Sequence, residues 1–378
     1  MIRSSKSVAG ALRIADPSMQ TAVGSSISPD RFRAVSELHS RAAAYRPTVS
    51  VVVCTRNRPD DLRECFHCIA KLMPRPDEVI VVDNSQGDAE SELLARSFGA
   101  RYVVEPVVGL SRARNRGMKE SRCEIVAYLD DDCLPDREWL EYLLRPFADS
   151  SVAAVTGEIV RFTDLEKERR IHRCKSHEVR YLNRETPRWF EMAAFGGVGI
   201  GTNMAFRKAV ASNQALFDER LGRGAPFQMA EENCAFASLI SMGYSIVRTS
   251  AAEVLHPEKP LDACEETKLS IAYSFLLFSR FSENRLDLLR FLLRRIARQP
   301  VSWRLEAEQS GIILASSWRE RLKAFPRGVA LFLRARRYSP QEPLLCAQPV
   351  DNPHAQLHAR VEPQIHKTVQ PMNPSASL

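Results

Sequence analysis

The sequence predicts an α/β protein with a mixed, mainly parallel sheet flanked by helices. Runs of β-branched and other apolar residues recur at 48–55, 78–83 and 124–129, and a strand that is apolar on both faces suits the buried middle of a parallel sheet. Stretches with apolar residues at helical spacing lie between these runs, as in proteins that alternate strands with helices. The 378 residues are 44% hydrophobic and 26% charged, a composition that excludes a collagen-like or wholly disordered chain.

The elements of the first half follow one another with short connections. Residues 48–55 form the first predicted strand, and residues 60–72 carry a helical stripe of Leu62, Phe66 and Ile69. The elements expected after them are, in order, a strand at 78–83, a helix at 88–98, a strand at 101–104, a helix at 111–121, a strand at 124–129, a helix at 135–147 and a strand at 152–160. Strands that alternate with helices of about 10–15 residues indicate a parallel sheet.

The second half is less regular and divides the chain into segments. Residues 161–195 are charged and irregular, 196–203 are a flexible glycine-rich stretch, 231–242 a helix and 244–249 a strand. Helical patterns follow at 267–281 and 286–298. We therefore expect four segments: a flexible N-terminal arm at 1–46, the α/β domain at 47–260, a basic helical extension at 261–337 and a disordered, proline-rich tail at 338–378.

Positive charge is concentrated in the helical extension. The formal net charge is +7, and residues 280–337 alone carry 14 basic and 5 acidic side chains. Amphipathic basic helices of this kind either lie on an anionic membrane surface or pack on the domain with their arginines in water. Nucleic acid is the weaker alternative, because these helices offer few exposed aromatic side chains.

Signals for export or membrane insertion are missing from the printed sequence. Residues 1–30 lack the apolar stretch of about 7–15 residues that an export signal needs, and no run reaches the roughly 18 apolar residues of a membrane span. The nine cysteines are read as reduced thiols. We expect a cytoplasmic protein, with peripheral attachment to the inner face of the cell membrane as an open alternative.

Polar residues end the predicted strands. Thr55, Asp83 and the triplet Asp130–Asp132 stand at three such ends, and ligands of parallel sheets bind beyond the carboxyl ends of the strands. Three adjacent carboxylates repel one another unless a cation lies among them. Mg²⁺ or Mn²⁺ takes oxygen ligands and shares them with substrate phosphates. The alternative is an acidic turn before the next helix, and the shared sheet edge favours a site.

Seven segments in order resemble family-2 glycosyltransferases, which have the Rossmann-like GT-A fold. The segments are Val51-Val-Val-Cys-Thr-Arg-Asn-Arg-Pro59, Val81-Val-Asp-Asn-Ser85, Gly109-Leu-Ser-Arg-Ala-Arg-Asn-Arg-Gly117, Tyr128-Leu-Asp-Asp-Asp132, Gly201-Thr-Asn-Met-Ala-Phe-Arg207, Phe217-Asp-Glu-Arg-Leu-Gly222 and the pair Glu231-Glu232. Each segment alone is weak, but seven in the family's order are specific. The resemblance covers about residues 48–258.

The resemblance implies a nucleotide site. Thr55, Arg58 and Asp83 match the family's nucleotide pocket, where Asp83 would accept a hydrogen bond from the base. Arg114 and Asn115 match an Ala-Arg-Asn element that approaches the diphosphate or braces the acidic triplet, and arginine suits phosphate through its planar fork. In the triplet, which resembles the family's Asp-x-Asp motif, Asp130 and Asp131 would lie nearer the ribose or just outside the direct ligands of the metal.

It also implies a metal and a catalytic base. Asp132 would be the direct ligand of Mg²⁺ or Mn²⁺, with Asp130 and the later His256 as further candidates. Glu232 would take the proton of the acceptor hydroxyl, with Glu231 orienting it, and the positive end of the helix would keep this base ionised.

The rest of the resemblance concerns the sugar and two departures from the family. Asn203 would help to receive the sugar and the acceptor, while Trp189 and Phe190 either stack on a sugar or belong to the core. Glu232 stands where the family usually has aspartate, and Ala230 stands where it has glycine.

The resemblance thus implies an inverting, metal-dependent glycosyltransferase. It would use a nucleotide-diphospho-sugar donor and the hydroxyl of a glycan, a lipid-linked sugar or a small molecule. A catalytically inactive sugar-nucleotide-binding module is the alternative, which the Glu231-Glu232 pair permits.

Overall fold

The computed structural model describes residues 46–162, 177–211, 215–257, 263–290 and 318–335. The expected proline-rich tail and, apart from Arg46, the expected N-terminal arm lie outside these residues. The same holds for most of the second expected C-terminal helix, from residue 291 onward.

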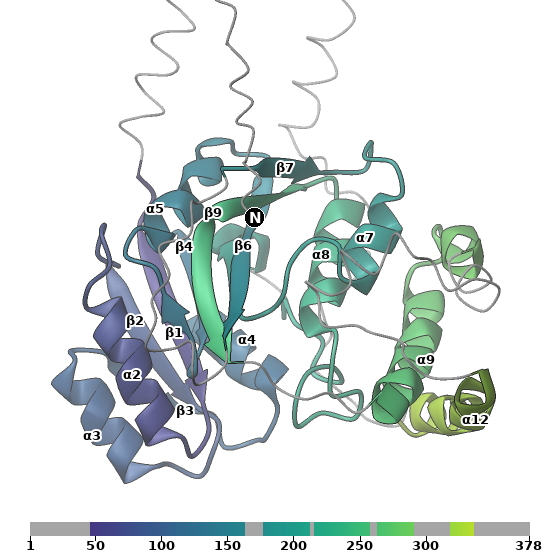
Figure 1. Cartoon of the computed structure of the whole chain (residues 1–378), viewed down its shortest axis with the longest axis horizontal. Helices are drawn as coiled ribbons and strands as arrows, with labels where there is room; N and C mark the ends of the chain where they lie inside the picture. Colours follow the sequence, from purple (N-terminus) through teal and green to yellow (C-terminus); the bar gives the residue numbers. More distant parts are fainter. Residues whose placement is uncertain (1–45, 163–176, 212–214, 258–262, 291–317, 336–378) are drawn as a thin grey trace, which may run out of the picture. The chain divides into compact units, whose positions relative to one another are not determined.

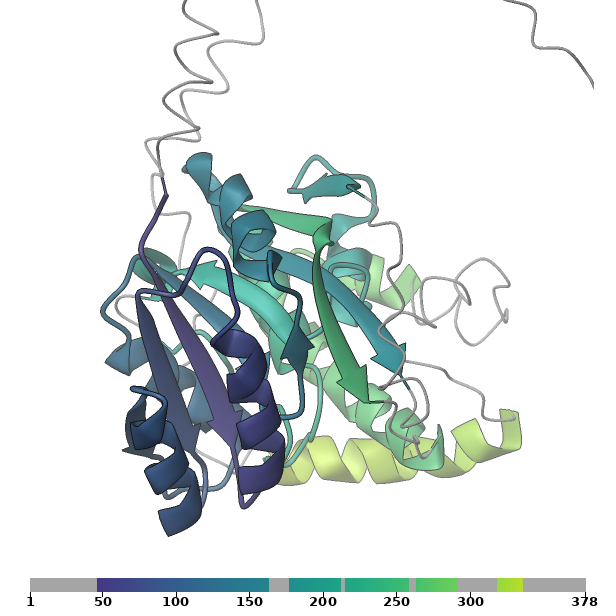
Figure 2. The same ribbon diagram turned by 60° about the vertical axis from the view of Figure 1, so that its left-hand side comes forward.

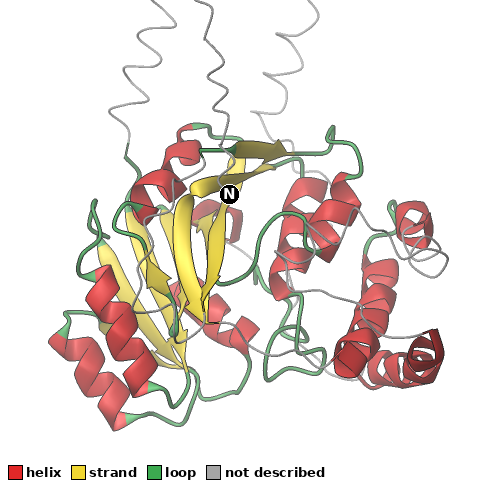
Figure 3. Ribbon diagram, in the orientation of Figure 1, coloured by secondary structure: helices red, strands yellow, loops and turns green. Residues whose placement is uncertain are grey.

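Described strands form one mixed sheet (Figure 1, Figure 3). Their order is β3-β2-β1-β4-β8-β6-β9-β5, and β7 pairs with β9. β3, β2, β1 and β4 run parallel, whereas β8 is antiparallel to both β4 and β6. The bounds are β1 Val49–Thr55, β2 Glu78–Asp83, β3 Arg101–Val104, β4 Ile125–Asp130, β5 Leu134–Pro135, β6 Val152–Phe162, β7 Val179–Leu182, β8 Asn203–Arg207 and β9 Ser245–Pro257. The expected mixed sheet flanked by helices is confirmed.

Helices cover both faces of this sheet. Their bounds are α2 Pro59–Ile69, α3 Ala89–Ser97, α4 Leu110–Glu120, α5 Trp139–Leu144, α7 Trp189–Phe195, α8 Glu231–Ser241, α9 Ala263–Arg280 and α12 Trp318–Ala335, with short 3-10 helices at Arg145–Ala148 and Lys208–Ala211. Figure 2 shows α2 and α3 together over one face. Side chains of β1 belong to two hydrophobic cores. Val51 lies in the core that contains Leu62 of α2, and Val52 lies in the core that contains Ala113 of α4. Burial of each such side chain stabilises the fold by about 1.5–3 kcal/mol.

One glycine brings α4 close to the sheet. A Cβ atom at Gly117 would lie 2.4 Å from Cγ1 of Val52, a distance at which one of the two residues would have to shift. Glycine therefore lets α4 lie directly on β1. Arg114, one turn earlier on α4, is thereby held near the ends of β1 and β4.

Four elements differ from the expectations. The stretch expected to be irregular contains helix α7, and the glycine-rich stretch leads directly into β8, whose residues Asn203–Phe206 are buried between β4 and β6. The helix expected at 135–147 is shorter, because Leu134–Pro135 pairs with β9. The strand expected at 244–249 is longer, because β9 continues to Pro257.

The helical extension begins on the core of the domain. Phe281, just after α9, packs edge-on against the buried Phe190 with ring centroids 5.3 Å apart, so Phe190 belongs to the core. On α9 itself, Phe275 stacks on Phe332 of α12 at 5.7 Å. Among the described residues, no helix is both long and apolar enough to cross a membrane. The domain boundary at 260 stays a prediction.

Candidate active site

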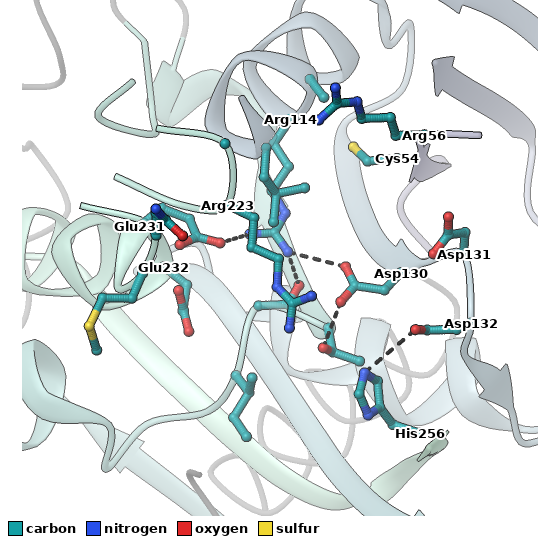
Figure 4. Close-up of a pocket in the computed structure, with 18 of the residues that line it drawn as sticks. Cys54, Arg56, Arg114, Asp130, Asp131, Asp132, Arg223, Glu231, Glu232 and His256 are labelled. Carbon is teal, nitrogen blue, oxygen red and sulfur yellow. Dashed lines mark hydrogen bonds and ion pairs between the residues drawn. The ribbon is translucent and has the colours of Figure 1, made fainter. Parts of the chain in front are cut away.

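A cleft of about 860 Å³ opens beyond the carboxyl ends of β1 and β4. It brings together residues that lie as much as two hundred positions apart in the sequence. The sequence-predicted residues that line it are Thr55, Arg58, Arg114, Asp130, Asp131, Asp132, Glu231, Glu232 and His256. Figure 4 shows the acidic triplet and His256 on one side of the cleft and the two glutamates on the other.

Asp130, the last residue of β4, is held by two donors from other elements. Its Oδ2 atom accepts a hydrogen bond of 2.9 Å from the Thr202 hydroxyl, and its Oδ1 atom lies 3.2 Å from Nη2 of Arg114. Both contacts fix its carboxylate in the middle of the cleft. Asp130 therefore links the triplet to Arg114, as expected for an arginine that braces the acidic residues.

Asp131 is buried and contacts both β1 and the loop that follows β1. The Thr55 hydroxyl donates to its Oδ2 atom at 2.8 Å, and Nη1 of Arg58 lies 3.2 Å from Oδ1. Burial raises the pKa of Asp131 to about 6. The hydrogen bond from Thr55 and the charge of Arg58 lower this pKa, whereas the charges of Asp132 and Asp130 raise it further. Thr55 and Arg58 thus contact the acidic triplet directly, through Asp131.

Asp132 and His256 form the candidate metal-binding pair. Nε2 of His256 lies 3.5 Å from Oδ1 of Asp132, a spacing that one divalent ion can bridge. The Cys133 thiol is near enough to join them, but hard ions such as Mg²⁺ and Mn²⁺ prefer oxygen ligands to sulfur. A carboxylate and an imidazole fit Mn²⁺ or Mg²⁺ with further ligands from substrate phosphates.

Arg114 joins the two sides of the cleft. Its buried guanidinium lies 2.5 Å from Oε1 of Glu231, a buried carboxylate at the start of α8, and donates to the Gly201 carbonyl at 3.0 Å. Burial lowers the pKa of Arg114, but the charges of Glu231 and Asp130 outweigh it and hold the pKa above its ordinary value. Glu231 is thereby occupied as a structural partner of Arg114.

Glu232, the next residue of α8, faces the cleft and is partly exposed. Burial raises its pKa to about 8, the charge of Glu231 adds to the rise, and Arg114 opposes it. We expected the helix N-terminus to keep this carboxylate ionised, and the shift has the opposite direction. The residue before the pair, Ala230, has a φ of 66°, a left-handed conformation that glycine adopts without strain. A tight turn thus exists without the family's glycine.

Three expected site residues lie beneath the cleft instead of lining it. Asp83 is fully buried and accepts hydrogen bonds from the Tyr102 hydroxyl at 2.5 Å and the Asp88 amide at 2.8 Å. Asn203 accepts from the Trp139 indole at 2.8 Å and donates to two carbonyls. Asn115 both donates to and accepts from the backbone of Phe217. These side chains hold neighbouring strands, helices and loops in place.

Three arginines in the cleft were not singled out from the sequence. Arg56, Arg161 and Arg223 all line it. Arg56 lies next to Thr55, and Arg161 is paired in register with His256 across β6 and β9. The only sequence signal for Arg223 is its position between two glycines after the Phe217–Gly222 segment.

The class of the α/β domain follows from a family comparison. Residues 50–213 match the model of glycosyl transferase family 2. The segment that carries β1 to β8 is therefore a glycosyl transferase family 2 domain, as the sequence resemblance indicated.

Two curated relatives agree with this class. The chain is 31% identical over 121 residues to glycosyltransferase AglE of Haloferax volcanii, covering 30% of this chain and 40% of that protein. It is 26% identical over 223 residues to the probable glycosyltransferase YdaM of Bacillus subtilis, covering 53% and 48%. A solved mannosyltransferase, PcManGT from Pyrobaculum calidifontis in complex with GDP-Man and Mn2+, has 17% identity and a TM-score of 0.47 over 87% of each chain. The chain thus spans less than half the length of these two curated relatives.

Proposed function

We propose that the chain is an inverting, metal-dependent glycosyltransferase. It would move a sugar from a nucleotide-diphospho-sugar to the hydroxyl of a glycan, a lipid-linked sugar or a small molecule. The observation that carries the proposal is that one cleft holds the acidic triplet with His256 on one side and Glu232 on the other. A phosphate-bearing donor and a proton acceptor then face the same space.

In the proposed reaction Glu232 is the base. The acceptor hydroxyl attacks the anomeric carbon, its proton passes to the Glu232 carboxylate, and the bond from that carbon to the diphosphate oxygen breaks with its electron pair on the oxygen. A base with a pKa near the working pH suits general-base catalysis. Glu231, held by Arg114 at 2.5 Å, would keep the first turn of α8 in position.

The donor would lie along the edge formed by β1, β2 and β4. Asp132 and His256 would hold Mg²⁺ or Mn²⁺, with Asp130 beside them; such an ion, when bound, neutralises charge on a departing diphosphate. Thr55, Arg58 and Asp131 form a connected cluster that suits the ribose or the base. Asp83 would not contact the donor itself. It would hold the loop after β2 in position, and Asn84 of that loop lines the cleft.

Donor turnover tests the proposal. Hydrolysis or transfer should be measured for uridine-, guanosine- and thymidine-diphosphate sugars, with Mn²⁺, with Mg²⁺ and with a chelator. We expect activity with at least one donor that depends on the metal and falls at least about 100-fold in Glu232→Gln. An Asp132→Ala variant with the parent's activity would contradict the assignment.

The alternative is a module that binds sugar nucleotides without turning them over. The longer Glu232 side chain, in place of the family's aspartate, is what favours it. Binding of a nucleoside diphosphate by the parent, together with no hydrolysis or transfer for any donor, would support this alternative. Loss of turnover with retained binding in Glu232→Gln would support the enzyme instead.

We also propose that α12 rests on an anionic lipid surface. Its buried face, with Ala324 and Gly328, packs toward α9. An adjacent stripe at i, i+4 and i+8 consists of Phe325, Val329 and Leu333, of which Phe325 is 51% and Leu333 is 54% exposed. Phe325 also contacts Phe275 of α9 edge-on, with ring centroids 6.1 Å apart. Such a stripe would enter the boundary between headgroups and acyl chains.

The charges around this stripe favour an anionic surface. Lys323, Arg327 and Arg334 are exposed, and residues 323–335 contain no acidic side chain. Each cation near an anionic membrane contributes about 1 kcal/mol. A lipid-linked acceptor would be within reach of an enzyme bound in this way.

Vesicle sedimentation tests the membrane contact. The parent should sediment with vesicles that contain phosphatidylglycerol and much less with pure phosphatidylcholine. The double variant Phe325→Ser with Leu333→Ser should lose this binding, whereas Leu93→Ser, an exposed leucine on α3, should not. Equal sedimentation of the parent with both vesicle types, or of both variants with anionic vesicles, would refute the contact.

A further inference from the structure

Arg223 reaches into the cleft from a loop that is tightly fixed. The carbonyl of Arg223 accepts a hydrogen bond of 2.8 Å from the amide of Leu110, at the start of α4. Gly222 and Gly224, on either side of it, have φ values of 86° and 81°. Both lie in the left-handed region, which side chains with a Cβ atom rarely adopt.

The two glycines also make the close approach of this loop possible. A Cβ at Gly222 would lie 3.1 Å from Cδ of Glu231, and one at Gly224 would lie 2.9 Å from Cγ1 of Val108. The loop is thus pressed against both α8 and the segment before α4. The starting point of the Arg223 side chain is therefore set by backbone geometry, although its end is exposed.

The guanidinium group of Arg223 lies between the two functional sides of the cleft. Figure 4 shows it between Glu232 on one side and Asp130 with His256 on the other. Arg58 and Arg114, which also line the cleft, are engaged by carboxylates. For Arg223, by contrast, no side-chain hydrogen bond or ion pair is formed with any residue that the structure describes.

We propose that Arg223 binds the diphosphate of the donor at the end that leaves with the nucleotide. This inference rests on the proposed function and adds a residue to it. A phosphate held near Asp132 and His256, with its sugar directed toward Glu232, would pass the position of this guanidinium. The planar fork of arginine donates two parallel hydrogen bonds to phosphate oxygens. Arg223 would therefore bind the β-phosphate and stabilise the charge that it gains as the sugar departs.

The test compares nucleoside diphosphates with monophosphates. Dissociation constants of UDP, GDP and dTDP, and of UMP, GMP and dTMP, are measured by calorimetry with Mn²⁺ for the parent, Arg223→Gln and Arg223→Lys. The control is Arg137→Gln, an exposed arginine in the turn before α5 and outside the cleft. Thermal unfolding of each variant verifies that it is folded.

A contact with the β-phosphate predicts a selective loss. For the diphosphate that the parent binds, Arg223→Gln should weaken affinity about tenfold or more, as expected for a lost charge-assisted hydrogen bond. The matching monophosphate should change by less than about twofold, and Arg223→Lys should be intermediate because lysine keeps the charge but not the fork. Arg137→Gln should match the parent throughout.

Other results would overturn the inference. Unchanged diphosphate affinity in Arg223→Gln would refute it, because a side chain that binds the diphosphate cannot be lost without a loss of affinity. Equal losses for mono- and diphosphates would refute it as well, since they would indicate a general effect on the cleft. If the folded parent binds none of the three diphosphates with Mn²⁺ or Mg²⁺, the proposed function itself fails together with the inference.

Discussion

Replacing Glu232 by glutamine should change stability and turnover in opposite directions. The carboxylate of Glu232 is confined by burial beside Glu231, which raises its pKa from an ordinary value of 4.5 to about 8. Glutamine keeps nearly the same shape but carries no charge. The variant should therefore lose turnover while its fold becomes more stable at high pH.

The sign and size of the stability change follow from proton linkage. Between pH 4.5 and pH 8 the folded protein keeps a proton on Glu232 that the unfolded chain has released, so the stability of the parent falls as pH rises through this window. Each pKa unit corresponds to about 1.4 kcal/mol. Since Glu231 shares in the shift, we expect Glu232→Gln to gain on the order of 2 kcal/mol over the parent at pH 9 and almost nothing at pH 4.5.

Urea unfolding of parent and variant between pH 4.5 and pH 9 measures this difference. Titrating groups that do not interact with Glu232 contribute equally to both proteins and cancel. Glu231→Gln is the matched control, because the adjacent carboxylate is paired with buried Arg114 at 2.5 Å. That variant should lose about 3–5 kcal/mol at neutral pH, as broken buried ion pairs do.

A flat difference between parent and Glu232→Gln across this pH range would refute the reasoning about burial. So would a variant that is less stable than the parent at pH 9. In either case the Glu232 carboxylate would have to be solvated or paired with a cation in solution, and the description of the cleft at the start of α8 would be wrong.

Three further predictions concern the same region. Arg114→Met should cost about 3–5 kcal/mol of unfolding free energy in urea, since it strands two carboxylates; a cost below about 1 kcal/mol would show that the pair is solvated. Ala230→Gly should stabilise the fold by up to about 1 kcal/mol by relieving the left-handed φ, and a loss of melting temperature would contradict that conformation. Asp132→Asn and His256→Ala should each weaken Mn²⁺ binding, measured by calorimetry, by roughly 10–100-fold or more. Loss of a residue that only supports a metal ligand already has an effect of this size. Unchanged Mn²⁺ affinity would exclude the two residues as ligands.

The structure separates residues that the motifs alone could not. Asp83, Asn115 and Asn203 stand in the same family-like segments as residues that line the cleft, yet their hydrogen bonds are formed with partners inside the protein. Their partners include Phe217, which is 102 positions from Asn115, and Trp139, which is 64 positions from Asn203. No local pattern identifies partners at that distance, so sequence reasoning could not decide which polar side chains face the ligand.

Local pattern alone determined the parallel half of the sheet and the place of the acidic triplet. The apolar run of β1 and the carboxylates after β4 are local features, because backbone geometry converts a run of apolar residues into a strand and puts its end at the sheet edge. Tertiary structure decided the rest: the antiparallel insertion of β8 between β4 and β6, the raised pKa of Glu232 and the entry of Arg223 into the cleft. Each of these depends on burial and charge contributed by distant segments, and those quantities exist only once the chain has folded.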